Sequence, residues 1–143
     1  MKDKHKKPKN NILIKDIDKN VMVGLNNQKS NTPYFSLRYL QEHSIKNCTD
    51  ASFFRDFLFR LGKLSELGWK GIATSNKHSY GVEYIPIDRF IPQKHPPCIT
   101  PDVDKLCVFR ANGDNRAFAG IRIDNIFEVI YIEAQINDLY NHS

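Results

Sequence analysis

With 143 residues, 41% of them hydrophobic, the chain is long enough for one compact core and too short for two ordinary domains. Its apolar runs fall well short of the roughly 20 residues that a membrane helix needs, and the N-terminus lacks the apolar segment of a signal peptide, so we expect a cytoplasmic protein. Three irregularly spaced cysteines argue against a disulfide framework, and the net charge of +5 is compatible with a nucleic-acid partner.

The positive charge lies at the N-terminal end of the chain. Residues 1–30 contain eight Lys and three Asp, which accounts for the whole net charge, so the remainder is neutral by formal count. We expect residues 1–33 to be a basic leader, either a flexible solubilising segment or an arm that contacts phosphates. Within it, residues 11–14 and 21–23 have the pattern of a short hairpin, and residues 24–33 are rich in turn formers, as in a linker.

Residues 34–143 are expected to form a single α+β domain that begins with a strand and a long helix. Alternation predicts the strand over residues 34–40. The helix follows Asp50, which can cap it, and ends at Gly68. Residues 69–78 add either a short second helix or a loop. The long helix should cover one face of a sheet with a stripe formed by Phe54, Phe57, Leu58, Leu61, Leu64 and Leu67.

Two further segments precede the C-terminal strands. Residues 80–87 predict a strand, and Pro86 places its end at a sheet edge because proline cannot donate to the ladder. Residues 90–101 contain four prolines and predict a loop at the rim of a site. His95 and Cys98 in this loop have a ligand-like spacing, but the paired spacing of a zinc site is missing. We therefore expect no metal. The sequence also has no phosphate-binding glycine loop, so we expect no nucleotide or other cofactor.

The C-terminal part predicts a three-stranded antiparallel β-meander, which completes an antiparallel sheet of four to five strands. Residues 105–111 and 116–123 alternate and are separated by a turn that begins Asn-Gly, the strongest short-range hairpin signal. A two-residue turn then joins Ile123 to Ile126. This register predicts four cross-strand pairs, Arg122 with Phe127, Gly120 with Val129, Phe118 with Tyr131, and Arg116 with Glu133.

The same register divides the meander into two faces. The helix is expected on an apolar face formed by Leu106, Val108, Ala117, Ala119, Ile121, Ile123, Ile126, Ile130 and Ile132. The other face collects Arg116, Phe118, Gly120, Arg122, Phe127, Val129, Tyr131 and Glu133. It is either an ordinary solvated face with an Arg116–Glu133 ion pair, or a basic and aromatic platform that binds a phosphodiester substrate.

The order of these elements, with arginines on the central strands and a terminus that contains Tyr and His, resembles the RelE/ParE-like toxins of bacterial toxin–antitoxin modules. The resemblance covers residues 34–142, and its best pieces are residues 108–110, 116–122, 127–132 and 138–142. It implies an endoribonuclease that cleaves mRNA on the ribosome without a metal, through the substrate 2′-hydroxyl. It also implies an antitoxin protein that neutralises the enzyme by covering the Arg116/Arg122 face or the groove beside the helix.

The resemblance assigns roles to individual residues. Arg116 and Arg122 would hold the scissile phosphate, with Tyr140 or His142 as the acid and Glu133 or Tyr131 as the base. The remaining candidates, for substrate binding, are Arg110, Phe118 and Lys105. ParE-like relatives act on gyrase and not on RNA, so the fold alone leaves the target open. The alternative is a non-catalytic binding protein of phage or mobile-element origin that docks a protein or a nucleic-acid backbone on the same face.

Overall fold

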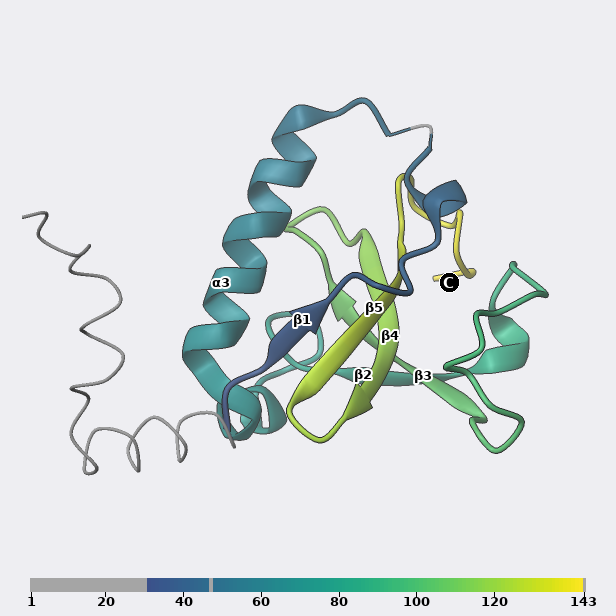
Figure 1. Cartoon of the computed structure of the whole chain (residues 1–143). Helices are drawn as coiled ribbons and strands as arrows, with labels where there is room; N and C mark the ends of the chain where they lie inside the picture. The colour runs from purple at the N-terminus through teal and green to yellow at the C-terminus, as the bar shows by residue number, and fades with distance from the viewer. Residues whose placement is uncertain (1–30, 47, 143) are drawn as a thin grey trace, which may run out of the picture. The chain divides into compact units, whose positions relative to one another are not determined.

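The computed structural model describes residues 31–46 and 48–142, which form one long helix and a five-stranded sheet. Figure 1 shows the helix, α3, lying along one face of that sheet. The prediction of an α+β fold with one helix on a mostly antiparallel sheet is confirmed. The hairpin expected from residues 11–14 and 21–23 lies outside the described residues. Within the described part, no helix combines the length and hydropathy needed to cross a bilayer.

The sheet has the strand order β1-β5-β4-β3-β2. Its strands are β1 (Tyr34–Ser36), β2 (Glu83–Pro86), β3 (Lys105–Arg110), β4 (Ala117–Ile123) and β5 (Ile126–Ile132), with short 3₁₀ turns η1 (Glu42–Ser44) and η2 (Ile87–Arg89). Strands β2 to β5 pair antiparallel, whereas β1 runs parallel to β5 and makes the sheet mixed. Pro86 ends the edge strand β2, as its missing N–H donor predicts.

Helix α3 (Ala51–Thr74) begins after Asp50, as the sequence predicts, and bends at Gly68, where the sequence predicts its end. The Asp50 side chain caps it by accepting a hydrogen bond from the Phe53 amide at 3.2 Å. At Gly68 the backbone leaves the helical region, with φ 72°, and a short second helical segment follows. A Cβ at Gly68 would collide with the Asn31 side chain, whose Oδ1 accepts from the Lys70 amide at 3.1 Å. Asn31 therefore caps the second segment.

The helix packs on the face of the sheet opposite to the predicted one. Its buried residues Phe53, Phe57, Leu64, Trp69 and Ile72 contact Phe109, Phe118, Phe127, Val129 and Ile132 of the sheet. The rings of Phe57 and Phe118 are 5.0 Å apart, and those of Phe109 and Phe118 are 5.2 Å apart. The predicted helix stripe was also shifted, since Leu58 is 67% exposed. The face that was expected to be the working surface is thus the main hydrophobic core.

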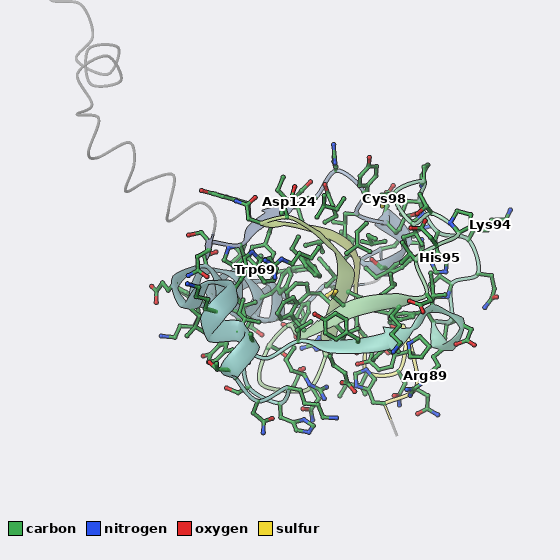
Figure 2. All side chains as sticks on the ribbon, turned by 90° about the horizontal axis from the view of Figure 1, so that it is seen from below. Trp69, Arg89, Lys94, His95, Cys98 and Asp124 are labelled. Atoms are coloured by element: carbon green, nitrogen blue, oxygen red, sulfur yellow. The ribbon has the colours of Figure 1, made fainter. Side chains whose placement is uncertain are left out.

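The other face of the sheet is covered by chain segments and not by solvent. Its cluster consists of Ile85, Phe90, Leu106, Val108, Ala117, Ala119, Ile130, Tyr131, Leu139 and Tyr140. The proline-rich loop joins the C-terminal segment through the hydrogen bond from Ile91 N to Leu139 O, 2.8 Å long, and through a bridge between Phe90 and Tyr140. Figure 2 shows Lys94, His95 and Cys98 of this loop far from Trp69 of the helix. Because both faces are buried, each carries apolar residues.

A β-bulge alters the register of β4 and β5 halfway along their length. The predicted pairing holds from Ile123 with Ile126 to Gly120 with Val129. Beyond the bulge Ala119 pairs with Tyr131, and Phe118 pairs with Ile132 and not with Tyr131. The close approach of the Glu128 carbonyl oxygen leaves no room for a Cβ at position 120, so glycine is required there. The bulge turns Tyr131 to the loop-covered face and separates Glu133 from Arg116.

Candidate active site

Arg116 is held in a structural role where α3 begins. Its guanidinium bonds the Asp114 carboxylate, at 2.6 and 2.8 Å, and the Ala134 carbonyl at 3.0 Å, and it lies 3.9 Å above the Phe53 ring. The side chain is 14% exposed. The predicted ion pair with Glu133 is not formed, because Arg116 is paired with Asp114 and with the helix cap Asp50, 3.6 Å away. Arg116 therefore ties the start of α3 to the β3–β4 turn.

Arg122 lies at the opposite end of β4 from Arg116. Its guanidinium lies 3.9 Å above the Trp69 ring, and its Nε donates to the Asp124 carbonyl at 2.6 Å. Phe53 and Trp69, the two rings on which the arginines rest, are sixteen residues apart on α3, which corresponds to about 24 Å of helix. The two arginines therefore cannot bind one phosphate together, as the resemblance implied.

Three other predicted site residues are also placed away from a common centre. Phe118 is fully buried in the core beneath α3. Tyr131 is fully buried on the opposite face, where its hydroxyl is 2.6 Å from His95 Nδ1. Lys105 begins β3 and Arg110 ends it, so the two are roughly 17 Å apart at about 3.3 Å per residue.

The remaining candidates converge at the end of β3. Together with His78, which was not predicted, they form a group that we call the Arg110 cluster: His78, Arg110, Glu133, Tyr140 and His142. Arg110 Nη1 is 3.4 Å from His142 Nδ1, and Arg110 Nη2 is 3.4 Å from His78 Nδ1. His142 Nε2 in turn lies 2.7 Å and 3.0 Å from the two carboxylate oxygens of Glu133. Two imidazoles therefore flank one guanidinium, and a carboxylate supports one of them.

The partners of each imidazole define its tautomer. A guanidinium has only donors, so the Nδ1 atoms that face Arg110 must be acceptors and carry no proton. For His142, the ring proton then lies on Nε2 and is donated to Glu133. A carboxylate commonly orients an imidazole in this way, by accepting the proton of one ring nitrogen and leaving the other nitrogen unprotonated.

Glu133 is buried but has a partner for each oxygen. It is 1% exposed, and besides His142 it accepts from the amides of Ala117, at 3.2 Å, and Leu139, at 3.3 Å. Burial raises the pKa of this carboxyl above its ordinary value, and the hydrogen bonds from His142 and the two amides oppose the rise. Glu133 is thus fixed by the end of β5 and the C-terminal segment, and it positions His142.

Tyr140 supports His142 from its other side. The two rings are stacked, with centroids 4.2 Å apart and an interplanar angle of 12°. Tyr140 is 3% exposed, and burial raises its pKa to about 12, so its hydroxyl keeps its proton at neutral pH. Of the two predicted acids, Tyr140 is therefore a positioning residue, whereas the His142 ring faces an open cleft.

That cleft has a volume of about 280 Å³ and is lined by His78, Arg110, Asn115, Ile136 and His142. Arg110 is anchored on its floor by donating to the Asn115 carbonyl at 2.9 Å. Among residues 31–46 and 48–142, no three His, Cys, Asp or Glu side chains form a group that could hold a metal ion. Two imidazoles beside a fixed positive charge are groups that can transfer protons to and from a bound molecule.

His78 is the member of the cluster that sequence reasoning did not place there. It lies in the loop after α3, far in sequence from Arg110, and is not among the predicted site residues. The loop is fixed by Arg60, which donates to the Ser79 carbonyl at 2.8 Å, and by Asn76, whose side chain accepts from the His78 amide at 2.8 Å. No local sequence signal predicts this tertiary contact.

Comparison with known proteins adds nothing to this geometry: no family model, curated protein or solved structure matches the chain.

Proposed function

We propose that the protein is a metal-independent endoribonuclease whose reaction centre is the Arg110 cluster. The observation that supports this most strongly is the position of Arg110 between His78 and His142, with one terminal nitrogen facing each Nδ1 atom. Phosphodiester transfer requires a base, an acid and positive charge at the phosphate, and the cluster has a candidate for each. The nucleophile would be the substrate's own 2′-hydroxyl.

His142 is the proposed base. Glu133 accepts its Nε2 proton, so the Nδ1 lone pair points toward Arg110 and the cleft. A 2′-hydroxyl bound there would displace the 3.4 Å contact with Arg110 and give its proton to Nδ1. The imidazolium that forms is stabilised by the Glu133 carboxylate, 2.7 Å away. Stacking on Tyr140 keeps the ring in this orientation.

Arg110 is the proposed phosphate ligand. Its described contacts use three of the five N–H donors of a guanidinium, which leaves two for the non-bridging oxygens of the scissile phosphate. Negative charge grows on these oxygens as the 2′-oxygen attacks phosphorus, so a fixed guanidinium stabilises the transition state more than the ground state. Because this cation is permanent, it repels a divalent metal ion in the same cleft.

His78 is the proposed acid, on the other side of Arg110. As the bond between the 2′-oxygen and phosphorus forms, the bond from phosphorus to the 5′-oxygen breaks, and that oxygen takes a proton from the His78 imidazolium. In this protonated form both ring nitrogens are donors, so the ring gives up its contact with Arg110 and turns toward the substrate. The products are a 2′,3′-cyclic phosphate and a free 5′-hydroxyl. The proton released by the 2′-hydroxyl remains on His142, so the two imidazoles exchange protonation states in each turnover.

The toxin role and the antitoxin partner remain part of the proposal. The Arg116/Arg122 face, which the antitoxin was expected to cover, is occupied by α3, so the cleft at Arg110 is the better target for inhibition. An antitoxin carboxylate that paired with Arg110 would block the approach of phosphate to both histidines. Growth arrest on expression, relieved by Arg110→Gln, is expected for such a toxin.

Product analysis tests the proposed chemistry. The wild-type protein, in the presence of a chelator, should convert a single-stranded RNA oligonucleotide to fragments that end in a 2′,3′-cyclic phosphate. The matched substrate with a 2′-deoxy sugar at the cleaved position should remain intact, because it lacks the nucleophile. RNA that stays intact under all conditions would favour the non-catalytic binding protein, and cleavage of the 2′-deoxy site would exclude the proposed mechanism.

A further inference from the structure

A second cleft lies beside the Arg110 cluster and is not used by the proposed reaction. It has a volume of about 250 Å³, and we call it the Phe59 cleft after its most exposed member. The residues that line it are Asp56, Phe59, Arg60, Lys63, Tyr80, Asn112 and Gly113. Both clefts include residues of the loop after α3 and of the β3–β4 turn, and α3 itself lines the Phe59 cleft with Asp56, Phe59, Arg60 and Lys63.

The shared loops place the two clefts within one or two nucleotides of each other. In the loop after α3, His78 lines the cleft at Arg110 and Tyr80 lines the Phe59 cleft. In the β3–β4 turn, Asn115 lines the cleft at Arg110 and Gly113 lines the Phe59 cleft. In each loop the two positions are two residues apart, which is at most about 7 Å of extended chain. A single strand of RNA whose scissile phosphate lies at Arg110 can therefore extend into the Phe59 cleft.

Phe59 is an aromatic side chain left in solvent. It is 73% exposed on the outer surface of α3, although burying a phenyl ring is strongly favourable in water. Base stacking on aromatic side chains is the main sequence-tolerant contact in single-strand recognition. The position of Phe59 at the mouth of a cleft gives it room for one base.

Two basic residues adjoin the ring. Arg60 stacks on Tyr80, with 4.6 Å from its guanidinium carbon to the ring centroid, and its position is fixed by Ser79. Lys63 is half exposed and makes one solvent-accessible ion pair with Glu66, 3.7 Å long, which a phosphate can displace at little cost. The single acid on the rim, Asp56, lies 3.6 Å from the Arg55 guanidinium outside the cleft. The cleft is therefore positive where a strand would pass.

We propose that the Phe59 cleft binds a nucleotide that flanks the scissile dinucleotide in single-stranded RNA, with Phe59 stacking on its base and Lys63 contacting its phosphate. This inference rests on the proposed ribonuclease function, because that function places the scissile phosphate at Arg110. Single-strand binding in the cleft can be measured independently of cleavage.

The test compares Phe59→Ala with Leu58→Ala, a matched control that removes the neighbouring side chain, which is 67% exposed and does not line the cleft. Cleavage of a hexanucleotide is measured beside that of a dinucleotide that fills only the reaction centre. Phe59→Ala should lower kcat/KM for the hexanucleotide roughly 5- to 100-fold, the effect of losing one stacked base, and leave the dinucleotide unchanged. Phe59→Trp should restore activity, and Leu58→Ala should resemble wild type.

Binding of a fluorescent 2′-deoxy-blocked hexanucleotide separates the two claims. If the wild type cleaves RNA but Phe59→Ala and Leu58→Ala bind and cleave equally well, the cleft inference is overturned and the ribonuclease function stands. If no RNA is cleaved but Phe59→Ala still weakens binding relative to Leu58→Ala, the ribonuclease proposal fails and single-strand binding in the cleft is supported. Binding of an acidic peptide in preference to the oligonucleotide would overturn the inference in favour of a protein partner.

Discussion

His142 Nε2 lies 2.7 Å from Glu133 Oε1, so the imidazole of the cleft is oriented by a carboxylate that is itself only 1% exposed. Glu133→Gln keeps the shape of the side chain but removes the negative charge that stabilises the imidazolium. We expect kcat for RNA cleavage to fall about 10- to 100-fold, as for other positioning carboxylates. Full pH–rate profiles of the purified variants provide the measurement.

The matched control for this variant is Glu128→Gln. Glu128 is a second buried carboxylate of β5, 1% exposed, but it pairs with Arg38 at 2.8 Å and has no contact with the Arg110 cluster. The folded Glu128→Gln variant should cleave RNA at the wild-type rate. Equal losses in both variants would show that Glu133 acts through stability alone.

Arg116→Ala should affect stability and not chemistry. The variant loses the charged hydrogen bonds to Asp114, the bond to Ala134 O and the contact with the Phe53 ring. We expect the free energy of unfolding to fall by about 3 kcal/mol, measured by denaturant titration, while the folded fraction keeps its kcat. A stable Arg116→Ala protein with lost activity would instead support the role that the resemblance assigned to this arginine.

Gly120→Ala should be strongly destabilising because the bulge leaves no space for a methyl group. The new Cβ would meet the Glu128 carbonyl oxygen, which belongs to the paired strand and cannot move away alone. We expect a loss of about 3 kcal/mol in the free energy of unfolding. Gly62→Ala is the comparison, since a Cβ there meets nothing within 4 Å and α3 should gain about 1 kcal/mol. Similar free energies of unfolding for the two variants would contradict the claim that the bulge leaves no space for a Cβ at position 120.

His95 should make the stability of the protein depend on pH. Burial lowers its pKa below the ordinary value of about 6.5, and its Nδ1 lies 2.6 Å from the Tyr131 hydroxyl oxygen. At a pH between the folded and unfolded pKa values the unfolded chain binds more protons, so this contribution is complete above about pH 6.5 and is lost as pH falls through that window. Thermal unfolding from pH 7.5 to 5 should show a drop in Tm that is smaller in His95→Gln. Parallel curves for the two proteins would refute this role.

Much of the fold follows from local sequence signals. Asp50 and Gly68 mark the two ends of the first helical segment because capping and a positive φ depend on a few neighbouring residues. The two-residue turn predicts the pairing of Ile123 with Ile126 for the same reason. Tyr131 faces the wrong side in the prediction, because the bulge at Gly120 arises from contact with a neighbouring strand.

The alternation of apolar residues in the sequence could not predict which face of the sheet α3 covers. Alternation distinguishes two faces of a strand, but here Phe118 on one face and Ala119 on the other are both fully buried. Which face receives α3 depends on the fit of Phe53 and Phe57 into the sheet and on the loop that covers the other side.

The site was predicted in part. Arg110, Glu133, Tyr140 and His142 were all named, but they were given Arg116 and Arg122 as partners. Those two arginines are six positions apart, which corresponds to about 20 Å of strand and already argues against a shared phosphate. His78 was missed because only tertiary structure brings its loop to Arg110.

The most direct test of the central claim is the rate of RNA cleavage by Arg110→Gln, measured beside Arg122→Gln in the presence of a chelator. Both variants remove one guanidinium, but only Arg110 lies between the two imidazoles. The Arg110 cluster predicts a loss of at least about 100-fold in kcat for Arg110→Gln, the usual effect of removing a group that stabilises transition-state charge, and a rate near wild type for Arg122→Gln. Equal rates for the two variants, or a loss confined to Arg122→Gln, would contradict a reaction centre at Arg110.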